Sequence, residues 1–154
     1  MQSEPLSTNI PSDRFADQGV QPIDPANLDV LNELMQREPI FHRPELGTMR
    51  QDFENMTVET FWEVGASGRR YSRKYVMDTL ELRHSQPHED PWETRDFHCL
   101  EIALDNYLIT YTLIQGERVT RRFSKGDAPR TTIWQRCGAD WKIVYHQGTV
   151  VENG

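Results

Sequence analysis

The sequence predicts an α+β fold, in which three helices near the N-terminus pack on one face of a curved, mostly antiparallel sheet of six strands. Two patterns support this prediction. Apolar residues recur at helical spacing in the first half of the chain, whereas the second half alternates apolar and polar residues between short turn segments. Because helices that precede a run of strands usually cover one face of the resulting sheet, the pattern indicates two layers.

Start signals mark the three expected helices. Asp24 is an N-cap with Pro25 at the first helical position, and leucines then recur at helical spacing to form the first helix. Thr48 and Gln51 have the spacing of a capping box, which predicts a short second helix. Ser72 is the expected cap of the third.

Six segments with strand-like alternation account for the sheet. They are rich in aromatic and β-branched residues, and the segments between them consist of turn residues such as Gly, Asn, Asp and Pro. The small-residue stretch Gly65–Gly68 breaks the first strand before the third helix. We expect strands at residues 58–64, 96–104, 107–115, 118–125, 130–137 and 141–150.

One domain accounts for most of the chain. Residues 1–22 hold too few apolar groups to repay the entropy of ordering, so we expect a flexible N-terminal arm followed by a single domain over residues 23–154. A chain of this length can bury roughly two thirds of the surface that its unfolded state exposes, so it needs no disulfide or metal cross-link to fold. Cys99 and Cys137 lie far apart in separate strands, which favours small buried thiols in a reduced compartment.

Composition restricts the partners and the compartment. Neither a membrane span nor an export signal is expected, so the predicted location is cytoplasmic. The net charge of −7 opposes binding to nucleic acid, which requires clustered positive charge. No cofactor is expected. Prolines around His84, His88, Glu89, Asp90 and His98 exclude a regular helical spacing, so we expect a polar loop rather than a metal site.

The closing strand carries a residue with acid–base chemistry. Alternation places Trp141 and Ile143 on one face of this strand, and Val144 and His146 on the other. A histidine there could serve as a general acid or base, since its ordinary pKa lies near neutrality. It could instead be a core histidine, satisfied by a neighbouring strand or by Glu63, which is itself the second candidate base.

Arg121 is the candidate anchor for an anion. It lies between Val119 and Phe123 on an alternating strand, which directs it to the side of those apolar groups. A guanidinium in a partly apolar cavity requires an anionic partner, because an unpaired buried charge is costly. That partner could be a ligand carboxylate or an internal acid such as Glu63, and in a reaction Arg121 would stabilise an oxyanion.

Aromatic and cationic residues supply the remaining candidate ligand contacts. Trp134 and Arg136 share a face of one strand, and rings beside guanidinium groups bind flat or anionic molecules well. Trp62 and Tyr111 are further candidates. An aromatic stripe on a sheet can equally form the core or a dimer surface, so each of these residues also has a structural interpretation.

Five separated stretches carry a family resemblance: Arg37–Pro39 with Phe41–His42, Phe61–Arg73, Thr120–Arg122, Thr132–Trp134 and Trp141–Thr149. With the order of elements, they resemble the nuclear transport factor 2-like superfamily, which contains ketosteroid isomerases and SnoaL-like polyketide cyclases. The residues in these stretches are most similar to those of a bacterial branch known as a domain of unknown function. The resemblance spans roughly residues 24–150, and several matching motifs make it specific.

The resemblance implies a cone-shaped fold, whose helices cover the concave side of the sheet and leave a ligand cavity, often in a homodimer joined through the sheets. It implies no particular reaction, because the superfamily includes isomerases, dehydratases, cyclases, hydrolases, binding modules and toxin-immunity proteins. The aspartate and tyrosine pair of ketosteroid isomerases has no clear counterpart. Asp96 and Tyr111 are present, but nothing aligns them into those roles.

Two functions are open at this point. The first is a small-molecule-binding protein with a mixed apolar and cationic pocket, which could transfer a proton on a small carboxylated ligand with His146 or Glu63 as the base. The second is a non-catalytic module that binds a protein, such as a basic toxin that the acidic chain would suit. A cone packed shut by Trp134 and Tyr111 would contradict the enzyme hypothesis.

Overall fold

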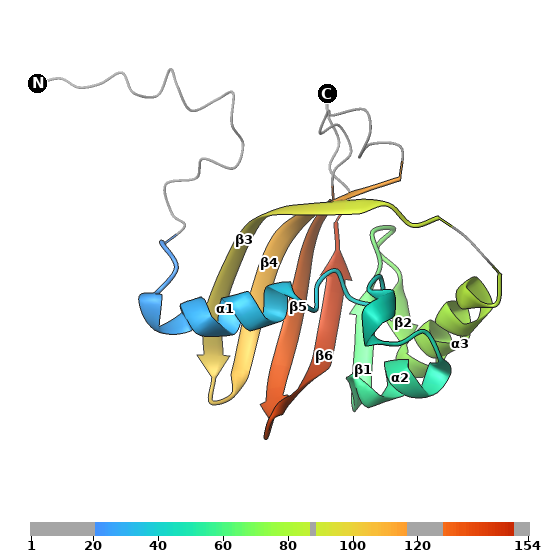
Figure 1. The fold of residues 1–154 in the computed structure, drawn as a ribbon, viewed down its shortest axis with the longest axis horizontal. Helices are drawn as coiled ribbons and strands as arrows, with labels where there is room; N and C mark the ends of the chain where they lie inside the picture. The colour runs from blue at the N-terminus through green and yellow to red at the C-terminus, as the bar shows by residue number, and fades with distance from the viewer. Residues whose placement is uncertain (1–20, 87–88, 117–127, 150–154) are drawn as a thin grey trace, which may run out of the picture.

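Three α-helices lie against one sheet in the computed structural model, which describes residues 21–86, 89–116 and 128–149 (Figure 1). The helix α1 (Leu28–Met35) crosses the face of the sheet, whereas α2 (Arg50–Asn55) and α3 (Arg73–His84) lie at one end of it (Figure 1). Short 3-10 turns, Pro25–Asn27 and Pro44–Leu46, precede α1 and α2. This arrangement confirms the predicted α+β class.

Six strands form the sheet of the described residues, in the spatial order β2-β1-β6-β5-β4-β3. All neighbouring strands are antiparallel except β1 and β6, which are parallel. The parallel pair joins the helical end of the sheet to the antiparallel meander. The strands are β1 (Thr57–Val64), β2 (Arg70–Ser72), β3 (Trp92–Ala103), β4 (Asn106–Gln115), β5 (Ala128–Cys137) and β6 (Asp140–Gly148).

Two strand predictions differ from this arrangement. The expected strand at residues 118–125 lies outside the described residues, and β2 contributes the sixth strand instead. We predicted a turn followed directly by a helix, but after the turn at Gly65–Gly68 the chain first pairs back onto β1. The strand β3 also begins at Trp92, four residues before the predicted start, because its first part pairs with the end of β4.

The helix starts follow the predicted capping chemistry, with one shift. The Asp24 carboxylate accepts a hydrogen bond from the Ala26 backbone at 2.9 Å and so caps the 3-10 turn that leads into α1, and the Ser72 hydroxyl accepts one from the Tyr75 backbone at 3.1 Å. The capping box predicted at Thr48 and Gln51 is wrong. Met49 caps α2, and its backbone N–H donates to the Asp52 carboxylate at 3.0 Å.

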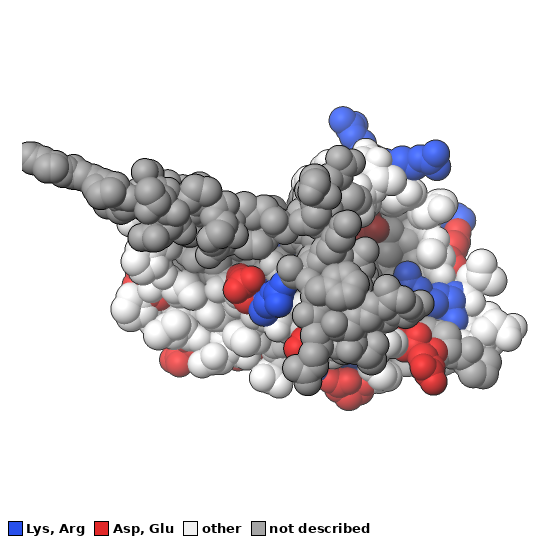
Figure 2. Space-filling model, turned by 90° about the horizontal axis from the view of Figure 1, so that it is seen from above, with Lys and Arg blue, Asp and Glu red and all other residues white. Residues whose placement is uncertain are grey.

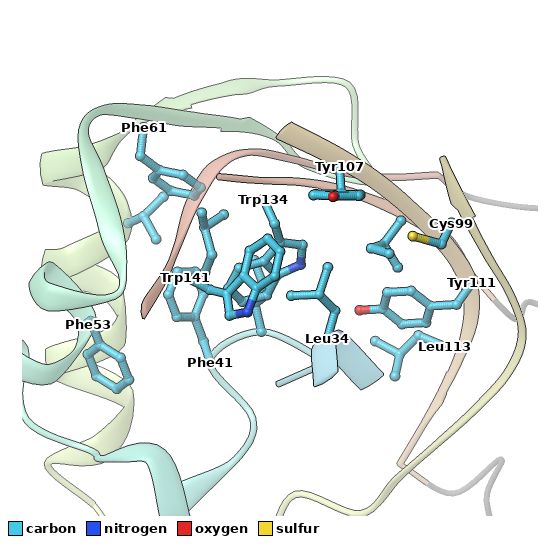
Figure 3. Packing of buried hydrophobic residues seen from close by; sticks show 14 of the residues in the cluster. Leu34, Phe41, Phe53, Phe61, Cys99, Tyr107, Tyr111, Leu113, Trp134 and Trp141 are labelled. Atoms are coloured by element: carbon cyan, nitrogen blue, oxygen red, sulfur yellow. The ribbon is translucent and has the colours of Figure 1, made fainter. Parts of the chain in front are cut away.

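The hydrophobic core lies between α1 and the inner face of the sheet. The helix buries Val30, Leu31 and Leu34 against the strands. Figure 3 shows Trp134 and Tyr111 extending from the strands toward Leu34. Both aromatic side chains are buried, with 2% and 3% of their surface exposed, so they fill the core beneath α1.

A bulge in β6 corrects the predicted alternation of this strand. Adjacent residues of β5 pair with Ile143 and Tyr145, so Val144 is an extra residue at this step. The phase of the strand therefore changes by one position. Trp141, Ile143 and His146 all face inward and are buried, whereas we had predicted His146 on the opposite face.

Charged side chains of the described residues are interspersed in the view of Figure 2, where acidic and basic groups lie next to one another. Among the described residues, no helix is long and apolar enough to cross a membrane.

Candidate functional site

A cavity of about 280 Å³ opens between α3 and the inner face of the sheet. Its apolar surface comes from α3 and from the segment after α1, and two tyrosines on either side of the α3 start, Tyr71 and Tyr75, stack at 4.8 Å between ring centroids. Its ionisable lining comes from five different elements and loops. These groups are His42, Glu63, Arg83, Arg130 and His146.

Arg130 enters the cavity from the beginning of β5 and lies flat against the last residue of β6. That residue is Gly148, where an added Cβ would lie only 3.1 Å from Nη1 of Arg130 and 3.4 Å from its Nε. A glycine inside a strand often marks such a close approach. The guanidinium therefore has its position because position 148 carries no side chain.

The hydrogen-bond partners of Arg130 are neutral. Its Nη1 donates to Nε2 of His146 at 3.4 Å, and its Nη2 donates to Oε1 of Gln115 at 3.3 Å. Among the described residues, its buried Nε has no hydrogen-bond partner, and no carboxylate lies within 4.0 Å of the guanidinium. A positive charge thus lines the cavity without a direct counterion in this part of the chain.

His146 orients this guanidinium. The ring is 5% exposed, and burial, followed by the charge of Arg130 and the nearby His42, lowers the pKa of His146 to about 3. The ring is therefore neutral at pH 7. Because arginine can only donate, Nε2 of His146 is the acceptor, and Nδ1 carries the proton that it donates to the Thr132 hydroxyl at 3.0 Å.

Behind this histidine lies a fully buried carboxylate, Glu38. It receives hydrogen bonds from the Tyr111 hydroxyl at 2.7 Å, the Trp134 indole at 2.8 Å and the Ile40 backbone at 3.2 Å, and it also bonds the Thr132 side chain. Burial raises the pKa of Glu38, and these hydrogen bonds oppose the rise. Glu38 lies in one of the stretches that carry the family resemblance, Arg37–Pro39, but we predicted no role for it.

Glu63 is the acid of the cavity itself. It lies on β1, directly beside His146 of β6 in the parallel register. Burial raises its pKa, while the positive charges of Arg130 and Arg83 act in the opposite direction. The side chain can therefore hold or release a proton closer to neutrality than an exposed glutamate can.

His42 is a second histidine of the cavity that sequence reasoning did not select. Its Nδ1 lies 2.6 Å from Oδ2 of Asp90. Burial lowers the pKa of His42, although the hydrogen bond and charge of Asp90 act to raise it. The two residues lie 48 positions apart, so no local spacing could have identified the pair.

Two of the predicted site residues, His146 and Glu63, meet at the cavity. Trp134 and Tyr111 instead bond Glu38 at the centre of the cone, so they fill the core beside an open cavity rather than closing it. Arg121 lies outside the described residues.

The other two candidates lie elsewhere. Trp62 packs on Tyr145 at 4.8 Å on the outer face and is 42% exposed, and the guanidinium of Arg136 lies 4.7 Å above the ring of Trp141. The ligand-binding roles of these candidates stay predictions. Among the described residues, no three His, Cys, Asp or Glu side chains come together to hold a metal ion.

Solved structures with the same architecture identify the fold. An uncharacterised protein with a cystatin-like fold from Caulobacter vibrioides matches with a TM-score of 0.60 at 15% identity, over 82% of this chain and 91% of its own. A nuclear transport factor 2-like protein of unknown function from Pseudomonas aeruginosa matches with a TM-score of 0.60 at 13% identity, over 78% and 97%. A candidate ketosteroid isomerase from Parabacteroides distasonis gives 0.56 at 12%, over 79% and 88%.

No family model matches the sequence, and no curated protein matches it. At such identities the structural similarity defines the fold and not the activity. The chain therefore has the cone-shaped nuclear transport factor 2-like fold that the sequence motifs predicted.

Proposed function

We propose that the cavity binds a small carboxylated molecule through Arg130. The observation that carries this proposal is the lack of a direct counterion for Arg130 among the described residues, although the guanidinium lines a partly buried cavity. In this proposal Arg130 is the anion anchor, and the same role predicted for Arg121, which lies outside the described residues, stays a prediction. Planar guanidinium groups bind carboxylates through paired hydrogen bonds, and no carboxylate of the described residues forms such a pair with Arg130.

The remaining lining suits a compact ligand with an apolar part. The volume of about 280 Å³ lies just below the range of roughly 300–1,000 Å³ typical of pockets for drug-sized molecules. Val76 and Leu80 of α3 provide an apolar wall, and Arg83 adds a second positive charge. A ligand of the size of an aromatic or short branched carboxylic acid fits this lining.

Proton transfer on such a ligand is the second part of the proposal, and Glu63 and His146 were its predicted bases. The contacts of His146 favour a positioning role, because one ring nitrogen accepts from Arg130 and the other bonds Thr132. Glu63 keeps a carboxyl group at the cavity with a raised pKa, which supports a role in donating or accepting a proton.

Benzoate is a suitable probe for the binding proposal. Calorimetric titration of the purified protein with benzoate should give saturable binding, and Arg130→Gln should weaken it roughly 10- to 100-fold, as expected for a lost charged hydrogen bond. The matched control is Arg136→Gln, because Arg136 lies over Trp141 and does not line the cavity. Equal benzoate affinity in wild type and Arg130→Gln would contradict the proposal.

We further propose that a second copy of the chain covers the outer face of the sheet. Paired residues form one apolar row across this face, from β3 to β1: Leu100, Leu108, Ile133, Tyr145 and Trp62. Leu100 and Trp62 at its two ends are 50% and 42% exposed. A row of this kind can pack against itself across a two-fold axis, which is the usual symmetry of homodimers.

Light scattering coupled to gel filtration tests this interface. Wild type should elute as a dimer and Leu100→Lys as a monomer, because a lysine in the row would bury an unpaired charge in an apolar interface. Leu82→Lys is the control, since Leu82 is 74% exposed on α3 and lies outside the row. A monomeric wild type, or a dimeric Leu100→Lys, would contradict this interface.

A further inference from the structure

The two histidines of the cavity have opposite hydrogen-bonding environments. Both ring nitrogens of His146 have neighbours, Arg130 and Thr132, and the ring is almost fully buried. His42 uses Nδ1 for Asp90, whereas its Nε2 has no hydrogen bond within the described part of the chain. Its side chain is 15% exposed and lines the cavity. His42 therefore keeps one ring nitrogen available to a ligand.

The surrounding backbone fixes the position of this histidine. The backbone N–H of His42 donates to the carbonyl of Pro39 at 3.2 Å, and its own carbonyl accepts from the Trp92 indole, also at 3.2 Å. Arg43 in turn lies 4.8 Å above the Trp92 ring. Because Asp90 precedes Trp92 by two residues, these contacts hold both members of the His42–Asp90 pair together.

This pairing determines which nitrogen of His42 can act. A carboxylate beside Nδ1 keeps the proton on that nitrogen and leaves the lone pair on Nε2, and it stabilises the imidazolium that forms when Nε2 takes a proton. Burial and the charges of Arg83 and Arg130 act against the protonated ring, so His42 is neutral and able to accept a proton at pH 7. The other ionisable side chains that line the cavity are His146, Glu63, Tyr71 and Tyr75.

We propose that His42, positioned by Asp90, is the general base of this cavity and removes a proton from a carbon acid whose developing oxyanion lies against Arg130. The inference deepens the proposed function, since the anion site at Arg130 is part of it. In the natural step a C–H bond on the carbon next to the ligand's carboxylate breaks, an N–H bond forms at Nε2, and the electron pair moves onto the carboxylate oxygens at Arg130 as an enediolate. Return of the proton from Nε2 to the same carbon completes an exchange without a further reactant.

The Kemp elimination of 5-nitrobenzisoxazole measures this base directly. In this probe the C–H bond at carbon 3 breaks and Nε2 gains the proton. The electron pair completes a nitrile, the N–O bond breaks, and its electrons leave on a coloured phenolate. The purified protein should accelerate the elimination above the rate with an equal concentration of free imidazole at the same pH. No acceleration would overturn the proposal.

Variants distinguish the contribution of His42 from those of neighbouring ionisable residues. His42→Gln should reduce the elimination rate by roughly 10²–10⁴-fold, the usual contribution of a general base, whereas His98→Gln, outside the cavity, should not change it. Glu63→Gln should have a smaller effect than His42→Gln. Retention of the rate in His42→Gln, or its loss in Glu63→Gln alone, would overturn the assignment.

The pH profile tests the role of Asp90 even where a variant is less stable. The rate should rise with pH as His42 loses its proton and then level off, with a midpoint below 6.5 because the pKa of His42 is lowered. Asp90→Asn should lower the plateau about tenfold or more and move the midpoint further down, since the carboxylate acts to raise this pKa. An unchanged pH profile in Asp90→Asn would overturn the proposal that Asp90 positions His42.

Benzoate binding distinguishes this inference from the proposed function. His42→Gln should still bind benzoate through Arg130, and Arg130→Gln should not. If neither wild type nor His42→Gln binds benzoate, the anion site at Arg130 is contradicted. If wild type binds benzoate but does not catalyse the elimination, only the role of His42 as the base is contradicted.

Discussion

Two ionisable side chains beneath the inner face of the sheet, Glu38 from the segment after α1 and Arg130 from β5, differ in the partners that the fold gives them. Glu38 is fully buried, and both its carboxylate oxygens accept hydrogen bonds, including those from Tyr111 and Trp134. Arg130 has neutral partners among the described residues, and its Nε has none. Because uncompensated buried charge is costly, we infer that the first group serves the fold, and the second is the group that we propose binds a carboxylated ligand.

Removal of Glu38 should have the largest effect on stability. Glu38→Ala would leave the Trp134 indole and the Ile40 backbone N–H buried without an acceptor, so we expect a loss of roughly 3–5 kcal/mol in the free energy of unfolding. Urea unfolding of the variant against wild type measures this loss. A cost within about 1 kcal/mol would show that the hydrogen bonds to Glu38 do not hold the filled centre of the cone together.

Acid should destabilise the cavity end through His146. The pKa of this ring is about 3 in the fold, against an ordinary value of 6.5, so the unfolded state binds the proton first as the pH falls. Its contribution is complete above pH 6.5 and is lost between about 6.5 and 3, with a slope of up to about 1.4 kcal/mol per pH unit. His146→Gln should flatten unfolding free energy against pH in this window relative to wild type. Parallel curves of unfolding free energy against pH for the two proteins would contradict a neutral His146 ring in the folded state.

Gly148→Ala should weaken ligand binding more than it weakens the fold. The new Cβ would lie 3.1 Å from Nη1 of Arg130, so the guanidinium must shift by a few tenths of an ångström from the position in which it bonds Nε2 of His146. We expect benzoate affinity to fall about tenfold, which corresponds to about 1.4 kcal/mol. The control is Ala139→Gly, in the turn between β5 and β6, which should leave benzoate affinity unchanged. Gly138→Ala in that turn would strain the backbone, because Gly138 has a positive φ. Unchanged benzoate affinity in Gly148→Ala would contradict the packing argument.

Replacement of Arg130 should have the smallest effect on stability, and its sign differs from that of Glu38. Arg130→Met removes a charge without a direct counterion and fills the space with an apolar chain, so we expect the ligand-free protein to be stabilised by about 1 kcal/mol or left unchanged. Thermal and urea unfolding without added anions measure the change. A loss above about 2 kcal/mol would mean that Arg130 already has its partner within the fold.

The predictable part of this molecule is the part governed by local patterns. Alternation, turn residues and the caps at Asp24 and Ser72 were sufficient for the α+β class, because each depends on residues a few positions apart. The two candidate bases Glu63 and His146 line the same cavity, although the inward direction of His146 was missed, and their roles in proton transfer stay predictions. The extra residue Val144 shifts the phase of β6, and alternation alone cannot reveal a bulge.

The cavity depends instead on contacts that sequence spacing cannot show. His42 and Asp90 meet across 48 residues, and Arg130 is positioned by a glycine two places after His146. Glu38 follows a helix that ends before a proline, and nothing local indicates that four donors converge on it. The proline at position 39 and the Gly148 position were the signals available for these sites, and both have other common explanations.

The bulge at Val144 separates two tasks within one strand. Before it, Trp141 and Ile143 pack the core, and after it, His146 and Gly148 shape the cavity. Because the two halves meet at a residue that pairs with no partner on β5, the inward-facing positions change phase along the strand. One extra residue thus lets a single strand contribute to the core at its start and to the cavity wall at its end.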